Sequence, residues 1–142
     1  MAKLYIIRGI PGSGKSTYAE ILRKDLWEEG HDVARFEADD YWMKDGQYKI
    51  DLKRLPMAHQ WCFDRTFNAF TKGCDTVIVS NTFTTMKELN PYINEAKNRN
   101  LEIVVYRMGN EFKNVHNVPE EVIEKMKARF EDYENEIVIK NV

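Results

Sequence analysis

The sequence predicts a single α/β domain with a mostly parallel sheet and helices on both faces of that sheet. Short apolar runs that resemble strands alternate with longer segments whose apolar residues recur at helical spacing. A glycine-rich loop, residues 9–16, joins the first run to the first helical segment. Alternation of this kind predicts parallel pairing, because each strand is followed by a helix that crosses over the sheet. The 142 residues contain no linker, repeat or low-complexity tract and are enough for one ordinary core.

The first third of the chain predicts a strand, a helix and a second strand. Residues 3–8 form an apolar run, and residues 15–28 have helical spacing up to Gly30, a residue that commonly ends helices. Residues 32–37 predict a short second strand, with residues 38–42 at its carboxyl end. Active sites of parallel sheets lie beyond the carboxyl ends of the strands, so the glycine-rich loop and residues 38–42 fall at the same functional edge.

The middle of the chain predicts a long helix and a buried strand. Residues 43–52 are polar and turn-like, whereas residues 55–71 have the pattern of a helix. Residues 76–79 form a β-branched run whose length and composition are typical of a buried strand. Large aromatic residues in the two helices are expected in the core, namely Trp27, Trp61, Phe63, Phe67 and Phe70.

The last part of the chain continues the alternation. Thr85 and Glu88 predict a capping box at the start of a helix that ends near Arg99. Pro91 fits this helix if it lies in the first turn, where a missing N–H is tolerated. The remaining expected segments are a strand over 101–106, a polar loop over 107–118, a helix over 119–133 with proline first, and an edge strand over 137–139.

The glycine-rich loop Gly-Ile-Pro-Gly-Ser-Gly-Lys-Ser matches the complete phosphate-binding pattern G-x-x-x-x-G-K-[ST]. Its glycines let backbone N–H groups converge on an anion, and the helix that follows points its positive end at the same place. Lys15 offers a flexible charge to the β- and γ-phosphates, and Ser16 offers a hydroxyl to Mg²⁺. The flanking strand and helix support nucleoside triphosphate binding over the alternative of a glycine-rich turn without a ligand. The residues expected to bind the nucleotide are Gly12, Ser13, Gly14, Lys15, Ser16 and Thr17.

Phosphoryl transfer also needs a carboxylate that accepts the proton of the acceptor hydroxyl, and positive charge near the transferring group. Asp39 and Asp40, directly after the second strand, are the candidate carboxylates. Adjacent residues point in different directions, so we expect Asp39 to face the phosphates and Asp40 to cap a helix or lie in a solvated turn. The polar loop is expected to act as a closing lid, in which Lys113 and Arg107 neutralise charge. A solvated strand end is the alternative for Arg107.

Composition narrows the class of protein. The formal net charge of −2 argues against wrapping a long nucleic acid, but not against a site for one nucleotide or one chain end. Cys62 and Cys74 are too few for a disulfide framework and lack metal-ligand spacing, so we expect reduced thiols and a cytoplasmic location. No stretch approaches the roughly 20 apolar residues that cross a bilayer, and the first residues lack a signal pattern. We therefore expect no membrane partner, and nothing in the sequence implies an obligate protein partner.

Several segments resemble the kinase domain of phage-type 5′-polynucleotide kinases and, more closely, small polynucleotide-kinase-like P-loop domains. The resemblance covers residue 3 to about residue 132. The phosphate loop alone is shared by many NTPases, whereas the Asp-Asp-Tyr placement together with the lid segment is much more specific. The segments are residues 5–17, Glu37-Ala38-Asp39-Asp40-Tyr41, Ala58-His59-Gln60-Trp61-Cys62, Asn81-Thr82, Pro91-Tyr92, and Asn-x-His-x-Val-Pro over 114–119.

This resemblance implies a P-loop kinase fold with a C-terminal lid over about 107–118. It implies ATP-dependent phosphorylation of a hydroxyl, in the best-known members the 5′-hydroxyl of a DNA or RNA end. ATP and Mg²⁺ are then the expected donor and cofactor. By the same resemblance Asp39 matches the general base, and Lys15 and Ser16 match the phosphate and magnesium ligands.

Three positions depart from the family pattern. Trp42 stands where phage enzymes have an arginine that grips the acceptor phosphate, and a tryptophan there either stacks on a base or belongs to the core. Lys113 replaces a frequent lid arginine, and Asn81 replaces a frequent carboxylate, which leaves Mg²⁺ to Ser16, the nucleotide and waters. The candidate substrate contacts are therefore Trp42, Asn81, His59 and the arginines Arg35, Arg54 and Arg65.

Three functions are compatible with these residues. The first is a kinase for the 5′-hydroxyl of a DNA or RNA end, with Asp39 as its base. The second is a kinase for a nucleoside, nucleotide or other small metabolite, which the net acidity mildly favours. The third is a non-catalytic nucleotide-binding module whose lid motion signals to a partner. An open basic channel that ends at Asp39 favours the first function, and a closed pocket favours the second.

Overall fold

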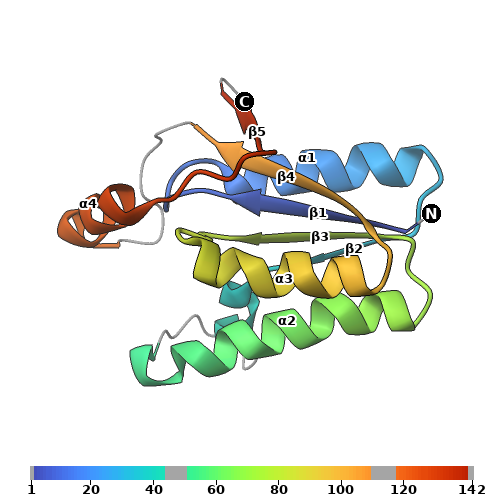
Figure 1. Cartoon of the computed structure of the whole chain (residues 1–142), viewed down its shortest axis with the longest axis horizontal. Coiled ribbons are helices and arrows are strands. Elements are labelled where there is room, and N and C mark those ends of the chain that lie inside the picture. Colours follow the sequence, from blue (N-terminus) through green and yellow to red (C-terminus); the bar gives the residue numbers. More distant parts are fainter. Residues whose placement is uncertain (1, 44–50, 110–117, 141–142) are drawn as a thin grey trace.

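The structure is a computed structural model that describes residues 2–43, 51–109 and 118–140. Helices and strands alternate along these residues, as the sequence predicts, and two short 3₁₀ turns, η1 and η2, follow the second strand (Figure 1). The elements are β1 (Lys3–Arg8), α1 (Lys15–Glu28), β2 (Val33–Phe36), η1 (Ala38–Met43), η2 (Leu52–Arg54), α2 (Leu55–Thr71), β3 (Thr76–Asn81), α3 (Met86–Asn98), β4 (Glu102–Met108), α4 (Glu120–Arg129) and β5 (Ile137–Ile139).

The five strands of the described residues form one sheet in the order β2-β3-β1-β4-β5, and every neighbouring pair is parallel. The prediction of a mostly parallel α/β sheet is therefore confirmed. In this register Arg8 at the end of β1 lies beside Asn81 on β3 and Arg107 on β4. The carboxyl ends of the central strands, and the loops that follow them, thus meet at one edge of the sheet.

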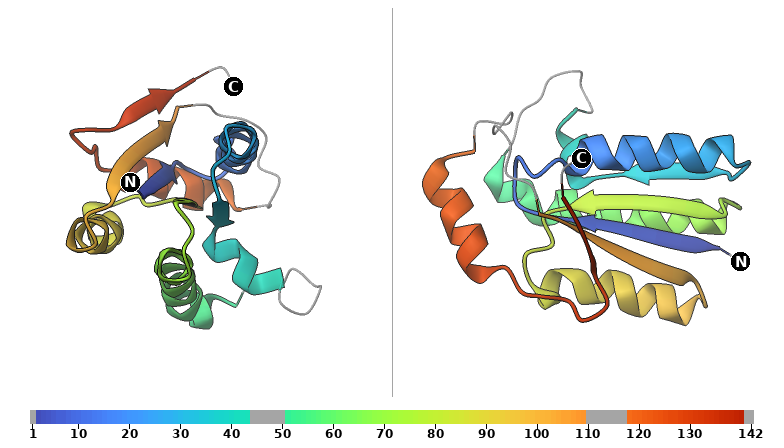
Figure 2. Two further views of the ribbon diagram at one scale, coloured as in Figure 1. Left: turned by 90° about the vertical axis from the view of Figure 1, so that its right-hand side faces the viewer. Right: turned by 90° about the horizontal axis from the view of Figure 1, so that it is seen from above.

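The helices cover both faces of the sheet, with α1 on one side and α2 and α3 on the other (Figure 2). Side chains on β1 alternate between the two cores because successive strand residues point to opposite faces. Leu4 and Ile6 join the larger core under α2 and α3, and Tyr5 and Ile7 join the smaller core under α1. This packing on both faces explains why the middle residues of the central strands are apolar, whereas polar residues stand at the strand ends.

Most expected boundaries agree with the structure, but some expectations differ from it. Trp27 is 65% exposed on α1 and lies outside the core, whereas the aromatic residues of α2 are packed in or against it. Pro91 lies inside α3, beyond its first turn, and the capping box of Thr85 and Glu88 is present. The helix tolerates this proline because the carbonyl left without its usual donor belongs to the exposed Lys87.

Another difference concerns the residue at which β4 ends. This strand continues to Met108, so Arg107 lies inside a strand and not in the loop where we expected it. The following helix is also shorter than expected, since α4 spans Glu120–Arg129 with Pro119 as its N-cap. Most of the expected lid, including Lys113, falls on residues 110–117, which lie outside the described residues.

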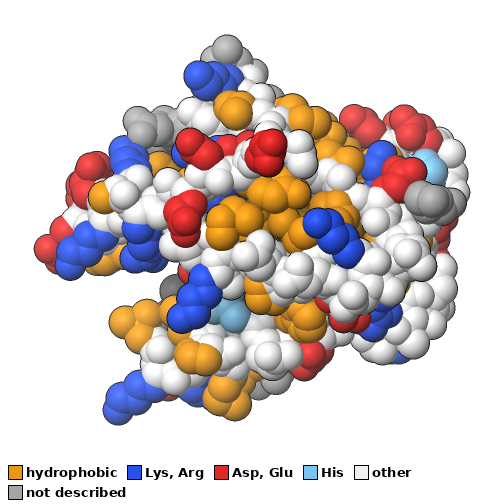
Figure 3. All heavy atoms as spheres, in the orientation of Figure 1, with side chains coloured by type: hydrophobic (Ala, Val, Ile, Leu, Met, Phe, Trp, Pro, Cys, Tyr) orange, Lys and Arg blue, Asp and Glu red, His pale blue; other side chains and the backbone are white. Residues whose placement is uncertain are grey.

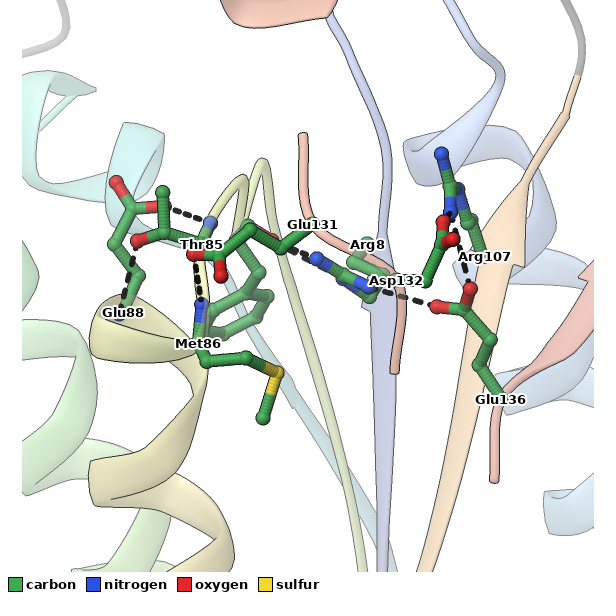
Figure 4. A network of polar contacts seen from close by, with 9 residues as sticks. Arg8, Thr85, Met86, Glu88, Arg107, Glu131, Asp132 and Glu136 are labelled. Atoms are coloured by element: carbon green, nitrogen blue, oxygen red, sulfur yellow. Dashed lines mark hydrogen bonds and ion pairs between the residues drawn. The ribbon is translucent and has the colours of Figure 1, made fainter. Parts of the chain in front are cut away.

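The chain after α4 returns along the carboxyl edge of the sheet and is held there by two arginines (Figure 4). The buried guanidinium of Arg8 donates to the Phe83 carbonyl from Nε (3.1 Å) and Nη2 (2.6 Å), and its Nη1 lies 2.7 Å from Glu136 Oε1. Arg107 bonds Glu136 Oε2 at 3.1 Å and also bonds Asp132. We call Arg8, Arg107, Asp132 and Glu136 the edge clamp.

No helix within residues 2–43, 51–109 and 118–140 combines the length and the apolar character that a membrane span requires.

Candidate active site

The phosphate loop turns directly from β1 into α1. Gly14 is the N-cap of α1 and has φ 92°, a left-handed conformation that a side chain would strain. Gly9 is required for a different reason, because a Cβ atom there would lie 2.4 Å from Ser13 Oγ. No side chain within residues 2–43, 51–109 and 118–140 caps the first turn of α1, and that turn contains no acidic residue. The backbone N–H groups of this turn are thus left to an anion, the arrangement that phosphate-binding loops share.

Lys15 folds back over the loop, where its Nζ donates a hydrogen bond to the Ile10 carbonyl at 3.0 Å. Burial lowers the pKa of Lys15 from its ordinary value near 10.5 to about 8, although the nearby carboxylates of Asp39 and Glu37 oppose this shift. A negatively charged ligand at the loop would favour the protonated form of the lysine. Lys15 is therefore placed where a phosphate would gain most from its charge.

The two aspartates after β2 differ as the sequence predicts. Asp40 is exposed, and its Oδ2 accepts a hydrogen bond from the Glu37 backbone N–H at 3.3 Å, so it stabilises the turn. Partial desolvation of the carboxylate by neighbouring groups and the charge of the Glu37 carboxylate raise the pKa of Asp40. Asp39 is half-buried and close enough to Lys15 to act on the lysine pKa. Within the described part of the chain no group donates a hydrogen bond to the Asp39 carboxylate, which leaves that carboxylate available as a base.

Asn81 has a structural contact in place of the expected exposure to substrate. Its side chain is buried at the end of β3, where Oδ1 accepts a 2.8 Å hydrogen bond from the Ala38 backbone N–H. Its Nδ2 lies 3.6 Å from the sulfur of Cys62, a buried free thiol. Asn81 thus fixes the residue that precedes Asp39 and positions η1 against β3.

Glu37, for which the sequence pattern predicts no role, lies beside the phosphate loop. The Glu37 Oε2 atom accepts hydrogen bonds from Ser16 Oγ at 3.3 Å and from Ser80 Oγ at 3.2 Å. The only signal in the sequence was a carboxylate at the carboxyl end of a strand, next to the more prominent Asp39 and Asp40. Its contact with Ser16 depends on how β2, β3 and α1 pack together.

Most of the candidate substrate contacts are occupied by neighbours. Trp42 is 6% exposed and packs edge-to-face on Tyr41, which favours the core alternative over base stacking. Arg35 bonds Glu20 on α1 at 3.0 Å. Arg54 bonds the Tyr41 hydroxyl at 2.6 Å. Of the remaining two, His59 is exposed on α2, and Arg65 is exposed and lies over the rings of Phe36 and Trp61.

Arg107 belongs to the edge clamp in this structure, with its guanidinium 4.4 Å from the Phe130 ring and bonded to Asp132 and Glu136. Its expected role as a charge-neutralising residue is untested and stays a prediction. The same holds for Lys113, which lies outside the described residues.

The molecular surface is hollowed at the carboxyl edge of the sheet, between α4 and the N-terminal part of α2 (Figures 1 and 3). The α4 border carries acidic as well as basic side chains, and the other border carries apolar side chains with basic ones among them (Figure 3). Exposed apolar residues of η2 and early α2 are Leu52, Leu55 and Met57. The exposed Lys53 and Arg54 of η2 add positive charge, so this border offers apolar contact together with basic side chains.

Sequence comparison finds relatives that include a human and a Pasteurella multocida protein, and no protein-family model matches the chain. It is 30% identical over 139 residues to human NEDD4-binding protein 2, a match that covers 92% of this chain but only 8% of the human protein. It is 28% identical over 149 residues to an uncharacterized protein of Pasteurella multocida, with 98% of this chain and 83% of that protein covered.

Solved structures of kinases and related proteins share the fold. Kti12 of Chaetomium thermophilum in complex with ADP-AlF3 has a TM-score of 0.70 at 14% identity, over 96% of this chain and 88% of that one. A chain of the Pnkp1/Rnl/Hen1 RNA repair complex has a TM-score of 0.67 at 19% identity, over 91% and 44%. The APS kinase CysC of Mycobacterium tuberculosis with AMPPNP and APS has a TM-score of 0.65 at 12% identity, over 96% and 88%. The chain therefore has the fold of P-loop kinases, and several of these neighbours bind nucleotides.

Proposed function

We propose that this chain is an ATP-dependent phosphotransferase whose acceptor is the 5′-hydroxyl of a DNA or RNA end. The observation that carries the proposal is the position of Asp39. Its half-buried carboxylate, free of hydrogen bonds from the described residues, lies near Lys15 at the mouth of the phosphate loop. A nucleotide-binding module has no need of an unengaged carboxylate at this place, whereas a kinase needs one.

In the proposed reaction the loop amides and Lys15 hold the β- and γ-phosphates of ATP. Asp39 accepts the proton of the acceptor hydroxyl while that oxygen bonds to the γ-phosphorus, and the bond to the bridging β,γ-oxygen breaks to release ADP. The oxygens gathered around Ser16 suit Mg²⁺, which when bound would neutralise charge on the phosphates. Lys113, in the expected lid, is the candidate to add positive charge to the transferring group.

Two findings support a nucleic-acid end as the acceptor. One is the likeness to a chain of an RNA repair complex that contains Pnkp1, which adds to the family resemblance of the Asp-Asp-Tyr and lid segments. The other is the open hollow at the carboxyl edge, because a chain end must enter without the rest of its strand colliding with the protein (Figure 3). Its apolar border suits base contacts, which depend little on sequence.

The test is transfer of labelled γ-phosphate from ATP and Mg²⁺ to 5′-hydroxyl DNA and RNA oligonucleotides, beside a panel of nucleosides and small metabolites. Asp39→Asn should lower the transfer rate by about 10²–10⁴-fold, the usual contribution of a general base. Its affinity for AMPPNP should be unchanged. Asp40→Asn is the matched control, since it makes the same chemical change one residue away and should keep transfer within a few-fold of wild type.

Label on the oligonucleotides that disappears in Asp39→Asn and persists in Asp40→Asn is the expected result. Label only on small molecules would overturn the acceptor assignment and favour the metabolite kinase, a reaction carried out by APS and sugar kinases among the structural neighbours. AMPPNP binding without any transfer would instead favour a nucleotide-binding module.

A further inference from the structure

The carboxylate of Glu37 is held between hydroxyl groups from two other elements. Glu37 directly follows β2, and its Oε2 atom accepts hydrogen bonds from Ser16 on α1 and from Ser80 on β3. Arg35 Nη2 lies 3.6 Å from the same oxygen, and the Glu37 side chain is 20% exposed. No described residue bonds the other oxygen, Oε1. One oxygen is thus fixed in place while its partner is left for a further ligand.

Ser16 is the residue whose hydroxyl a phosphate loop offers to Mg²⁺. In many P-loop enzymes an aspartate on a neighbouring strand completes the protein side of the metal site. The two neighbours of β1 in this chain are β3, which ends in Ser80 and Asn81, and β4, which ends in Arg107 and Met108, so neither ends in a carboxylate. Asn81 is already bonded to Ala38. The carboxyl end of β3 therefore supplies positioning groups but no anionic oxygen.

Glu37 supplies that oxygen from the next strand. Its long side chain reaches from the end of β2 across the end of β3, as its bond to Ser80 requires. Mg²⁺ is commonly held by only one or two carboxylates, with phosphate oxygens and waters completing the octahedral shell. Within the described residues no cluster of three or more His, Cys, Asp or Glu side chains is placed to bind a metal. A metal site in which the nucleotide phosphates and waters supply most of the ligands needs no such cluster.

We propose that Glu37, positioned by Ser80, is the carboxylate that works with Ser16 to hold the Mg²⁺ of a bound nucleoside triphosphate. The inference rests on the proposed function for the nucleotide, but it does not depend on which acceptor is used. It predicts that the Glu37 charge raises the affinity for the nucleotide when the metal is present and lowers that affinity when the metal is absent. Triphosphate and Glu37 are both anionic, so they repel each other at close range unless a divalent cation lies between them.

The experiment is a titration with AMPPNP in saturating Mg²⁺ and in EDTA, together with Mn²⁺ binding measured by electron paramagnetic resonance in the presence of AMPPNP. Wild type should bind AMPPNP at least about tenfold more tightly with Mg²⁺, a gain of 1.4 kcal/mol. In Glu37→Gln this gain should largely disappear, with Mn²⁺ affinity about 10–100-fold lower. Affinity in EDTA should stay equal to wild type or rise, because the repulsion is gone.

Two further variants separate this role from a structural one. Glu20→Gln is the matched control, because Glu20 also bonds Arg35 and lies one helical turn after Ser16 on the exposed surface of α1, but among the described residues no hydrogen bond joins it to Ser16 or Ser80. It should leave the metal dependence unchanged. Ser80→Asp in the Glu37→Gln background places a carboxylate beside the position of the Glu37 carboxylate, since Ser80 Oγ lies 3.2 Å from Glu37 Oε2, and should restore much of the Mg²⁺ gain.

The inference is overturned if Glu37→Gln keeps the full Mg²⁺ gain and the wild-type Mn²⁺ affinity, or if wild type itself binds AMPPNP equally well with and without the metal. Equal losses in Mg²⁺ and in EDTA, without rescue by Ser80→Asp, would also overturn it, because they indicate damage to the loop. Failure of the oligonucleotide assay has no effect on these measurements, so the acceptor assignment and the metal site fail separately.

Discussion

Removal of the buried arginine of the edge clamp tests how the carboxyl edge is held together. Arg8 is 0% exposed, directly precedes the phosphate loop and makes three hydrogen bonds, two to the Phe83 carbonyl and one to Glu136. Phe83 has φ 44°, a strained conformation for a residue with a side chain, and the two bonds from Arg8 help to hold it. Arg8→Met keeps an unbranched side chain against the Phe130 ring but removes the charge and every donor.

The expected loss in the free energy of unfolding depends on the Glu136 carboxylate, which stays buried after Arg8 is removed. Breaking a buried ion pair by removing one partner costs about 3–5 kcal/mol, because the remaining charge stays buried. Glu136, whose side chain is 9% exposed, keeps Arg107 as a partner at 3.1 Å, so we expect the lower end of that range. A loss of about 3 kcal/mol corresponds to a fall of roughly 6–12 °C in Tm for a chain of this size.

Thermal and urea unfolding followed by circular dichroism measure this loss, and Arg107→Met is the matched control. Arg107 lies over the same Phe130 ring and bonds the same Glu136, but its side chain is 28% exposed. Partly exposed ion pairs contribute about 1 kcal/mol or less, so Arg107→Met should lower Tm by only a few degrees. Equal losses in the two variants, or a loss below about 1 kcal/mol in Arg8→Met, would refute the argument that burial sets the cost.

Two further predictions concern the candidate active site. Lys15→Met should stabilise the nucleotide-free protein by up to about 3 kcal/mol. Keeping Lys15 charged in the folded protein costs about this much, because its pKa is about 8 in place of 10.5. The hydrogen bond that Lys15 donates to Ile10 is lost in the variant and reduces the gain. The unfolded chain binds more protons than the folded one between those two values, so urea unfolding should show wild type gaining stability on the variant from pH 8 to 10.5. AMPPNP should no longer raise the Tm of Lys15→Met. Asn81→Ala should lower kcat with whichever acceptor is phosphorylated, while AMPPNP affinity stays near wild type, because it removes the hydrogen bond that fixes Ala38 and, next to it, Asp39. Asn81→Asp keeps an oxygen that can accept the Ala38 hydrogen bond, so its kcat should fall less. A larger fall in Asn81→Asp than in Asn81→Ala would contradict this role.

Local patterns were enough to predict the elements with strong periodicity. The helices over Lys15–Glu28 and Leu55–Thr71 agree with the structure at both ends. The error at Trp27 shows the limit of this reasoning. The buried face of α1 is set by Ala19 and Leu26, and Trp27 is one residue, or about 100°, further around the helix. An apolar residue in a helical segment is therefore not sufficient evidence of burial.

The end of β4 depended on contacts that no local pattern contains. Arg107 and Met108 are strand residues because they pair with Val138 and Ile139 of β5, about thirty residues later in the chain. Taken alone, the charged and flexible composition after Tyr106 predicts a loop. The same reason applies to Glu37, whose contacts with Ser16 and Ser80 follow from the strand order and register and not from neighbouring residues.

The short strand β2 is attached to β3 at two points that both bear on the chemistry. Asn81 accepts a hydrogen bond from the Ala38 N–H, which fixes the residue before Asp39. Ser80 donates a hydrogen bond to the carboxylate of Glu37, the proposed metal ligand. Consecutive residues of β3 thus position the proposed base and the proposed metal ligand, while β1, paired beside β3, leads into the phosphate loop. Because η1 is only six residues of 3₁₀ turn, it has little internal rigidity with which to place Asp39 unaided. The distance between base and phosphate loop is therefore a property of the β1–β3 pairing, so substitutions at the buried end of β3 should alter catalysis even where they touch neither nucleotide nor acceptor.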